Sequence, residues 1–169
     1  MPLSIYQSSI VPITRALRNL RAIVQKGADH AAAKKIEESA LVNARLYPDM
    51  FDFAGQVQIA TDMARAAAAR LTNQEPLKID DNEKTFAELI ARIDRTLEYV
   101  QGIPESAFEG ADTRTITRPV RGQPHAFTAQ SYLQDFIMPN LYFHSAIAYG
   151  LLRHGGVELG KADFIGKIG

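Results

Sequence analysis

The segment from Thr128 to His154, TAQSYLQDFIMPNLYFHSAIAYGLLRH, constrains the fold of this chain more than any other stretch. Its apolar side chains recur at helical spacing, and two glycines at positions 155 and 156 end the pattern. At about 1.5 Å per residue, one helix over this segment would span about 40 Å. A helix of that length needs other long helices to cover its apolar side, so the segment predicts a helical bundle.

Three further segments have apolar residues in steps of three and four, the spacing of amphipathic helices. They cover residues 4–26, 50–71 and 85–101. The last of them opens with Thr85 and Glu88, which match a capping box that satisfies free backbone donors. These segments and the C-terminal one predict an all-α fold, an antiparallel four-helix bundle.

The ends of the predicted helices follow from glycine and capping residues. Gly27 is expected to end the first helix as a left-handed cap, and a short extra helix at residues 30–38 is expected to begin at Asp29. Either Asp49 or Asp52 can cap the helix predicted for residues 50–71.

The segment between residues 112 and 128 is expected to form a small β-hairpin before the last long helix, with its turn at Arg121–Gly122. Pro119 and Pro124 should make the hairpin irregular, and two strands alone need the bundle for support. The glycine-containing tail is expected to pack outside the bundle as coil. The length of the chain and the lack of a repeat predict a single domain over residues 1–169.

Composition excludes several classes of function. The chain has 19 basic and 19 acidic residues, so no basic excess indicates a nucleic-acid partner. It has no cysteine, which excludes disulfides and thiol catalysis. The N-terminal residues resemble neither a signal peptide nor a membrane span. We therefore expect a cytoplasmic protein with no membrane partner.

The histidine of the last long helix is the first candidate for chemistry. His144 forms an i, i+4 pair with Asn140 on the apolar side that carries Leu141 and Ala148. A structural interpretation makes His144 a core residue that is hydrogen-bonded to a polar neighbour. A functional interpretation makes it a metal ligand or an acid–base group, because neutral imidazole serves both roles.

Polar residues of the second long helix are the expected partners of this histidine. Gln58 and Asp62 are also spaced i, i+4, although Asp62 alternatively faces solvent. We expect one ring nitrogen of His144 to bond to one of these two side chains and the other to face a cleft. The predicted ligand cleft is lined by Tyr47, Asp49, Gln58, Asp62, Asn140, Tyr142 and His144.

Short motifs spread over most of the chain carry a family resemblance. They are Ala44–Met50, Gln56–Ala60, Thr85–Leu89, Phe108–Gly110, Pro139–His144, Leu152–Gly156 and Leu159–Lys161. In these motifs the chain resembles the DinB/YfiT-like superfamily of four-helix bundles, and more closely a bacterial branch of it that is described as a domain of unknown function.

The resemblance implies a position for a metal site. Metal-binding members hold a divalent metal with one histidine from the second long helix and an H-x-x-x-H pair from a later helix. The matching positions here are near Gln58 and at Asn140 and His144, so one of three is histidine. Amides are weak ligands for nickel or zinc. We therefore expect no tightly held transition metal, and His144 would be the ligand if one bound.

Two functions from different classes follow from the resemblance. The first is a small-molecule-binding or stress-associated bundle with a vestigial metal cleft, paired as a homodimer through the alanine-rich helix around Ala66–Ala69. The alternative is a nickel- or zinc-dependent enzyme, a hydrolase or a thiol transferase, in which Asp49 or Asp62 replaces a missing histidine.

Overall fold

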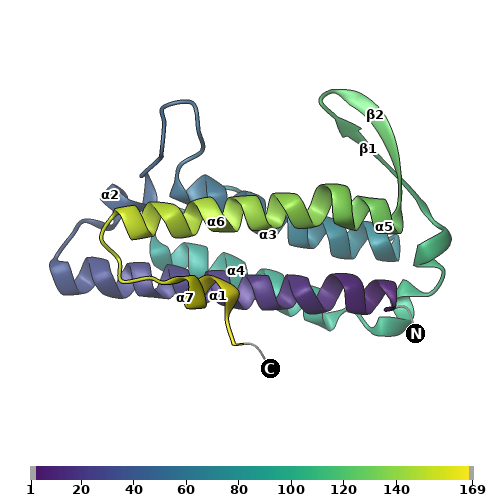
Figure 1. The fold of residues 1–169 in the computed structure, drawn as a ribbon, viewed down its shortest axis with the longest axis horizontal. Helices are drawn as coiled ribbons and strands as arrows, with labels where there is room; N and C mark the ends of the chain where they lie inside the picture. The colour runs from purple at the N-terminus through teal and green to yellow at the C-terminus, as the bar shows by residue number, and fades with distance from the viewer. Residues whose placement is uncertain (1–2, 168–169) are drawn as a thin grey trace.

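Four long helices lie side by side in the computed structural model, which describes residues 3–167 (Figure 1). They are α1 (Ile5–Lys34), α3 (Phe53–Thr72), α4 (Phe86–Gly102) and α6 (Met138–His154). The main contacts join α3 to α6 and α4, and α1 to α4 and α6, and α1 also contacts α3. Most described residues are helical, and the predicted all-α four-helix bundle is confirmed.

The helix directions follow from a long crossover loop. Residues 73–85 run back along the bundle, where Arg65 donates to the carbonyl of Leu77 and Gln58 donates to Glu83. The start of α4 therefore lies beside the start of α3. As a result α3 is antiparallel to α6 and α1 is antiparallel to α4, as predicted, whereas α3 and α4 run parallel (Figure 1). The predicted antiparallel arrangement therefore does not extend to every neighbouring pair.

The alanine-rich run of α3 lies inside the bundle. Ala60, Ala64, Ala67 and Ala68 are fully buried, and small side chains allow the neighbouring helices to approach closely. The predicted use of this run as a dimer face is therefore wrong, because the bundle itself already covers it.

Gly27 is a close-packing residue rather than the end of a helix. The first helix continues to Lys34 and ends at Lys35, which takes the left-handed conformation with φ 54°. A Cβ at Gly27 would come within 2.8 Å of Phe86 Cε1 and 2.9 Å of Leu152 Cδ1. The predicted cap at Gly27 and the separate helix at residues 30–38 are therefore wrong.

The connection between the first two long helices contains a short helix, α2 (Glu38–Val42), and an exposed loop over residues 43–52. Asp52 is the N-cap of α3, and its Oδ1 accepts a hydrogen bond of 2.9 Å from the Gly55 amide. Asp52 therefore takes the capping role for which the sequence left Asp49 and Asp52 as alternatives.

The predicted hairpin is confirmed as β1 (Thr115–Val120) and β2 (Gln123–Thr128), which pair antiparallel. Two 3₁₀ turns, Glu105–Phe108 and Ala111–Thr113, lead into it. Arg121 and Gly122 form its two-residue turn with φ of 50° and 79°, both in the region such turns require. The guanidinium carbon of Arg118 lies 3.8 Å from the centre of the Phe136 ring, so the hairpin is attached to the bundle.

The C-terminal helical segment is continuous but not uniform. It begins with α5 (Ala129–Ser131), passes through a π-helical turn at Tyr132–Ile137 and continues as α6. Pro139 lacks a backbone N–H and cannot make the normal bond one turn back, so the backbone widens before it.

The tail forms a helix that the sequence did not predict. It is α7 (Lys161–Ile165), and it lies along α1 (Figure 1). Lys26 Nζ lies 2.7 Å from Asp163 Oδ1, and Asn19 Nδ2 donates to the Phe164 carbonyl at 3.0 Å. The prediction of coil is therefore wrong for these residues. Within residues 3–167, no helix combines the length and the apolar character needed to cross a membrane.

Candidate functional site

His144 is half-buried and contacts α3, as predicted, but its partner is a different residue. Its Nδ1 lies 2.8 Å from Gln56 Oε1, so the prediction of Gln58 or Asp62 as partner is wrong. Gln56 Nε2 donates to the Phe51 carbonyl at 3.0 Å, which leaves Oε1 free to accept from the imidazole. Burial lowers the pKa of His144 below its ordinary value of 6.5, so the ring is neutral at pH 7.

Gln58 and Asp62 lie on another side of α3, in a polar cluster around Arg92. The Arg92 side chain is fully buried, and its Nη2 lies 2.6 Å from Asp62 Oδ1 and 2.8 Å from Asp81 Oδ1. Its Nη1 lies 3.0 Å from Glu83 Oε1, and Gln58 donates to the same carboxylate. The cluster fastens the crossover loop to α3 and α4.

Opposing effects act on the pKa of Glu83, one of the acids around Arg92. Burial alone would raise the pKa of Glu83, but hydrogen bonds from Gln58 and Arg92 outweigh it and lower the pKa below its ordinary value. Arg92 was not among the residues predicted from the sequence. Its position beside Ile93, on the apolar face of an amphipathic helix, was the signal that could have identified it.

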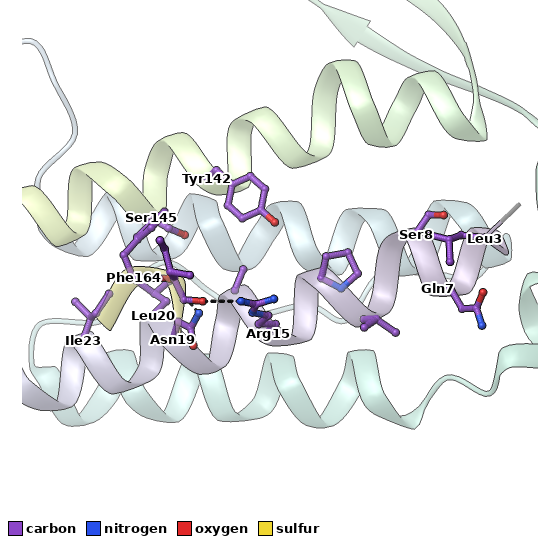
Figure 2. Close-up of a pocket in the computed structure, with 14 residues that line it drawn as sticks. Leu3, Gln7, Ser8, Arg15, Asn19, Leu20, Ile23, Tyr142, Ser145 and Phe164 are labelled. Carbon is purple, nitrogen blue, oxygen red and sulfur yellow. Dashed lines mark hydrogen bonds between the residues drawn. The ribbon is translucent and has the colours of Figure 1, made fainter. Parts of the chain in front are cut away.

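The other predicted cleft residues do not gather around His144. Asn140 Nδ2 donates to the Phe136 carbonyl of its own helix at 2.7 Å. Tyr47 and Asp49 are exposed in the loop over residues 43–52. Tyr142 points from α6 toward α1 (Figure 2). Two positions along an α-helix differ by about 200°, so His144 lies on a different side of α6.

The three positions that the family resemblance implies for a metal do not fit nickel or zinc. His144 already engages Gln56, the Asn140 amide donates to backbone, and Gln58 belongs to the Arg92 cluster. One imidazole and two amides supply neither the charge nor the softness these metals prefer. In the part of the chain that the structure describes, no three His, Cys, Asp or Glu side chains converge as a metal site.

A groove of about 510 Å³ lies between α1 and α6, and α7 closes one side of it (Figure 2). This volume is in the range of small-molecule sites, which are mostly apolar with a few placed polar groups. Most of its wall is apolar and is formed by Val11, Pro12, Ala16, Leu20, Ile23 and Phe164.

The polar side chains that line the groove are Gln7, Ser8, Arg15, Asn19, Tyr142 and Ser145. Arg15 Nη2 donates to the Ile165 carbonyl at 3.1 Å, which uses one of its five N–H donors. Tyr142 points toward the Arg15 side of the groove (Figure 2). Ser145 is 4% exposed, and its hydroxyl has no hydrogen-bond partner among the described residues.

Charge and burial set the protonation state of the tyrosine. Burial raises the pKa of Tyr142 above its ordinary value of 10.0, and the nearby positive charge of Arg15 only partly opposes this rise. The phenol therefore keeps its proton at neutral pH and can donate a hydrogen bond. Tyr142 is the one residue of the predicted cleft that lines this groove, whereas Arg15 and Ser145 were missed.

Comparisons with known proteins agree with the fold. A family described as "Domain of unknown function (DUF1993)" matches residues 5–165. A crystal structure of a DinB family member protein from Shewanella denitrificans is similar to this chain, with 42% sequence identity and a TM-score of 0.89. The match covers 96% of this chain and 92% of that one. The comparison with curated proteins gives no match.

Proposed function

The chain belongs to the DUF1993 family of DinB-like helical bundles. We propose that it binds a small molecule in the groove that the bundle forms between α1 and α6. The ligand is amphipathic, because an apolar wall and a few polar groups share one concave site. The four-helix bundle is the scaffold, and the groove is the proposed binding site.

One observation carries the proposal: the Ser145 hydroxyl is buried at the groove without a partner. A buried polar group that forms no hydrogen bond costs about 1–3 kcal/mol. A bound molecule that hydrogen-bonds to this hydroxyl would recover that cost. The surrounding apolar side chains would add affinity by removing the apolar part of the ligand from water.

The test uses a neutral dye whose fluorescence rises in apolar surroundings, such as Nile red. Ala16 is half-buried in the groove, so Ala16→Phe should fill it and reduce dye binding at least about tenfold. Ala22 is exposed on the same helix and does not line the groove, which makes Ala22→Phe the matched control. Equal dye binding by the two variants would contradict the proposal.

We also propose that the protein pairs as a homodimer through the outer face of α6. The segment from Phe136 to Leu152 contains no charged residue, yet Phe143 is 54% exposed and Ala146 is exposed. A helix that is uncharged on its outer side usually packs against something.

Charge supports a second copy of this chain as the partner at that face. The hairpin near the start of α6 carries arginines and no acid. The loop over residues 43–52 lies near the end of α6 (Figure 1); its one arginine, Arg45, pairs with Asp52, and its other acid, Asp49, is exposed. In an antiparallel pair of α6 helices, each hairpin would approach the partner copy's loop.

A further inference from the structure

We propose that the groove ligand is an elongated carboxylic acid, with its single carboxylate bound at Arg15. This inference rests on the proposed binding function and narrows it to one chemical class. The ligand is a monoanion with an apolar body.

The charge of the groove supports the class of ligand. Among the described residues that line the groove, Arg15 alone is charged, and none is Asp or Glu. None of the ion pairs within residues 3–167 includes Arg15. A guanidinium that faces an apolar groove without a carboxylate lacks the partner its planar donors fit.

The count of charges and donors supports a single carboxylate. One arginine balances one negative charge, so a dianion such as a phosphate monoester would leave its second charge without a cation among the described residues that line the groove. The protonated phenol of Tyr142 and the hydroxyl of Ser145 are further donors on the α6 side of the groove. Neither hydroxyl can neutralise a second charge.

The shape of the groove supports an elongated body. Its lining runs along α1 from Gln7 to Ile23 (Figure 2), a distance of about 24 Å at the helical rise. The wall is apolar on both sides of Arg15, with Val11 and Pro12 on one side and Leu20 on the other. An alkyl chain or a similarly narrow apolar body matches that form.

The experiment compares three straight-chain probes with ten carbon atoms each: decanoic acid, 1-decanol and decylamine. Each displaces Nile red from the full-length protein at neutral pH and physiological salt. The acid should bind at least about tenfold more tightly than the alcohol, because hydrogen bonds between charged groups are stronger than neutral ones. The amine should bind most weakly.

Variants assign the preference to Arg15. Arg15→Gln should remove the advantage of the acid over the alcohol. Arg18→Gln removes a charge from the same helix outside the groove, and Lys26→Gln removes an α7 tether without touching the groove. Both control variants should keep the preference for the acid.

The outcomes separate this inference from the proposed function. Equal affinities for acid and alcohol in the unmodified protein would overturn the carboxylate while leaving the groove as a binding site. An acid preference that persists in Arg15→Gln would also overturn it. Dye binding that Ala16→Phe does not affect would instead overturn the proposed function.

Discussion

Replacing Arg92 with methionine should destabilise the bundle far more than the loss of a surface ion pair would. The guanidinium is fully buried and donates to Thr61 Oγ1 at 2.7 Å and to the Asp80 carbonyl at 3.2 Å, besides its carboxylate partners. Methionine keeps the apolar stem but leaves Glu83, whose side chain is 6% exposed, without its cation. Removing one partner of a buried ion pair costs about 3–5 kcal/mol, against about 0–1 kcal/mol for an exposed pair.

Urea unfolding followed by circular dichroism measures this loss, since a domain of this size is typically stable by about 5–15 kcal/mol. Arg95 is exposed on the same helix, so Arg95→Met is the matched control and should change stability by less than about 0.5 kcal/mol. Adding Glu83→Gln to Arg92→Met should recover part of the loss, because it removes the unpaired buried charge. A loss below about 1 kcal/mol for Arg92→Met would refute the reasoning.

Three further predictions concern the histidine, the metal and the oligomer. Burial lowers the folded-state pKa of His144, so the unfolded state takes up the proton first as the pH falls. The free energy of unfolding should therefore decrease below about pH 6.5, and His144→Leu should reduce this pH dependence in urea titrations. Elemental analysis of protein purified without a metal-affinity tag should give far less than one nickel, zinc or iron per chain, and a near-stoichiometric metal would favour the enzyme alternative. Sedimentation at micromolar concentration should give a dimer that Phe143→Glu dissociates, and a single 18.7 kDa species in the unmodified protein would contradict the dimer.

The sequence predicted the architecture because its longest helices have clear apolar periodicity and recognisable caps. The capping box at Thr85 is present, with the Glu88 amide donating to the Thr85 hydroxyl at 3.2 Å. The role of Gly27 could not be predicted because it depends on Phe86 and Leu152, which are distant in the sequence. A single sequence does not distinguish a glycine that allows close packing of neighbouring helices from a glycine that ends a helix.

The candidate site was harder to predict, for a physical reason. Helix α3 is buried on most of its sides, so its periodicity does not indicate which polar residue faces which neighbour. The predicted partner of His144 was Gln58 or Asp62, whereas the structure places Gln56 there, two positions before Gln58. The groove itself depends on α7, which packs on α1 through tertiary contacts such as the bond from Arg15 to the Ile165 carbonyl.

The most direct test of the central claim is a ¹H–¹⁵N spectrum of the protein titrated with decanoate. The amide signals that shift most should belong to residues of the α1–α6 groove, among them Arg15, Tyr142, Ser145 and Phe164. Shifts that centre instead on Gln56 and His144, or an unchanged spectrum, would contradict binding of the carboxylic acid in this groove.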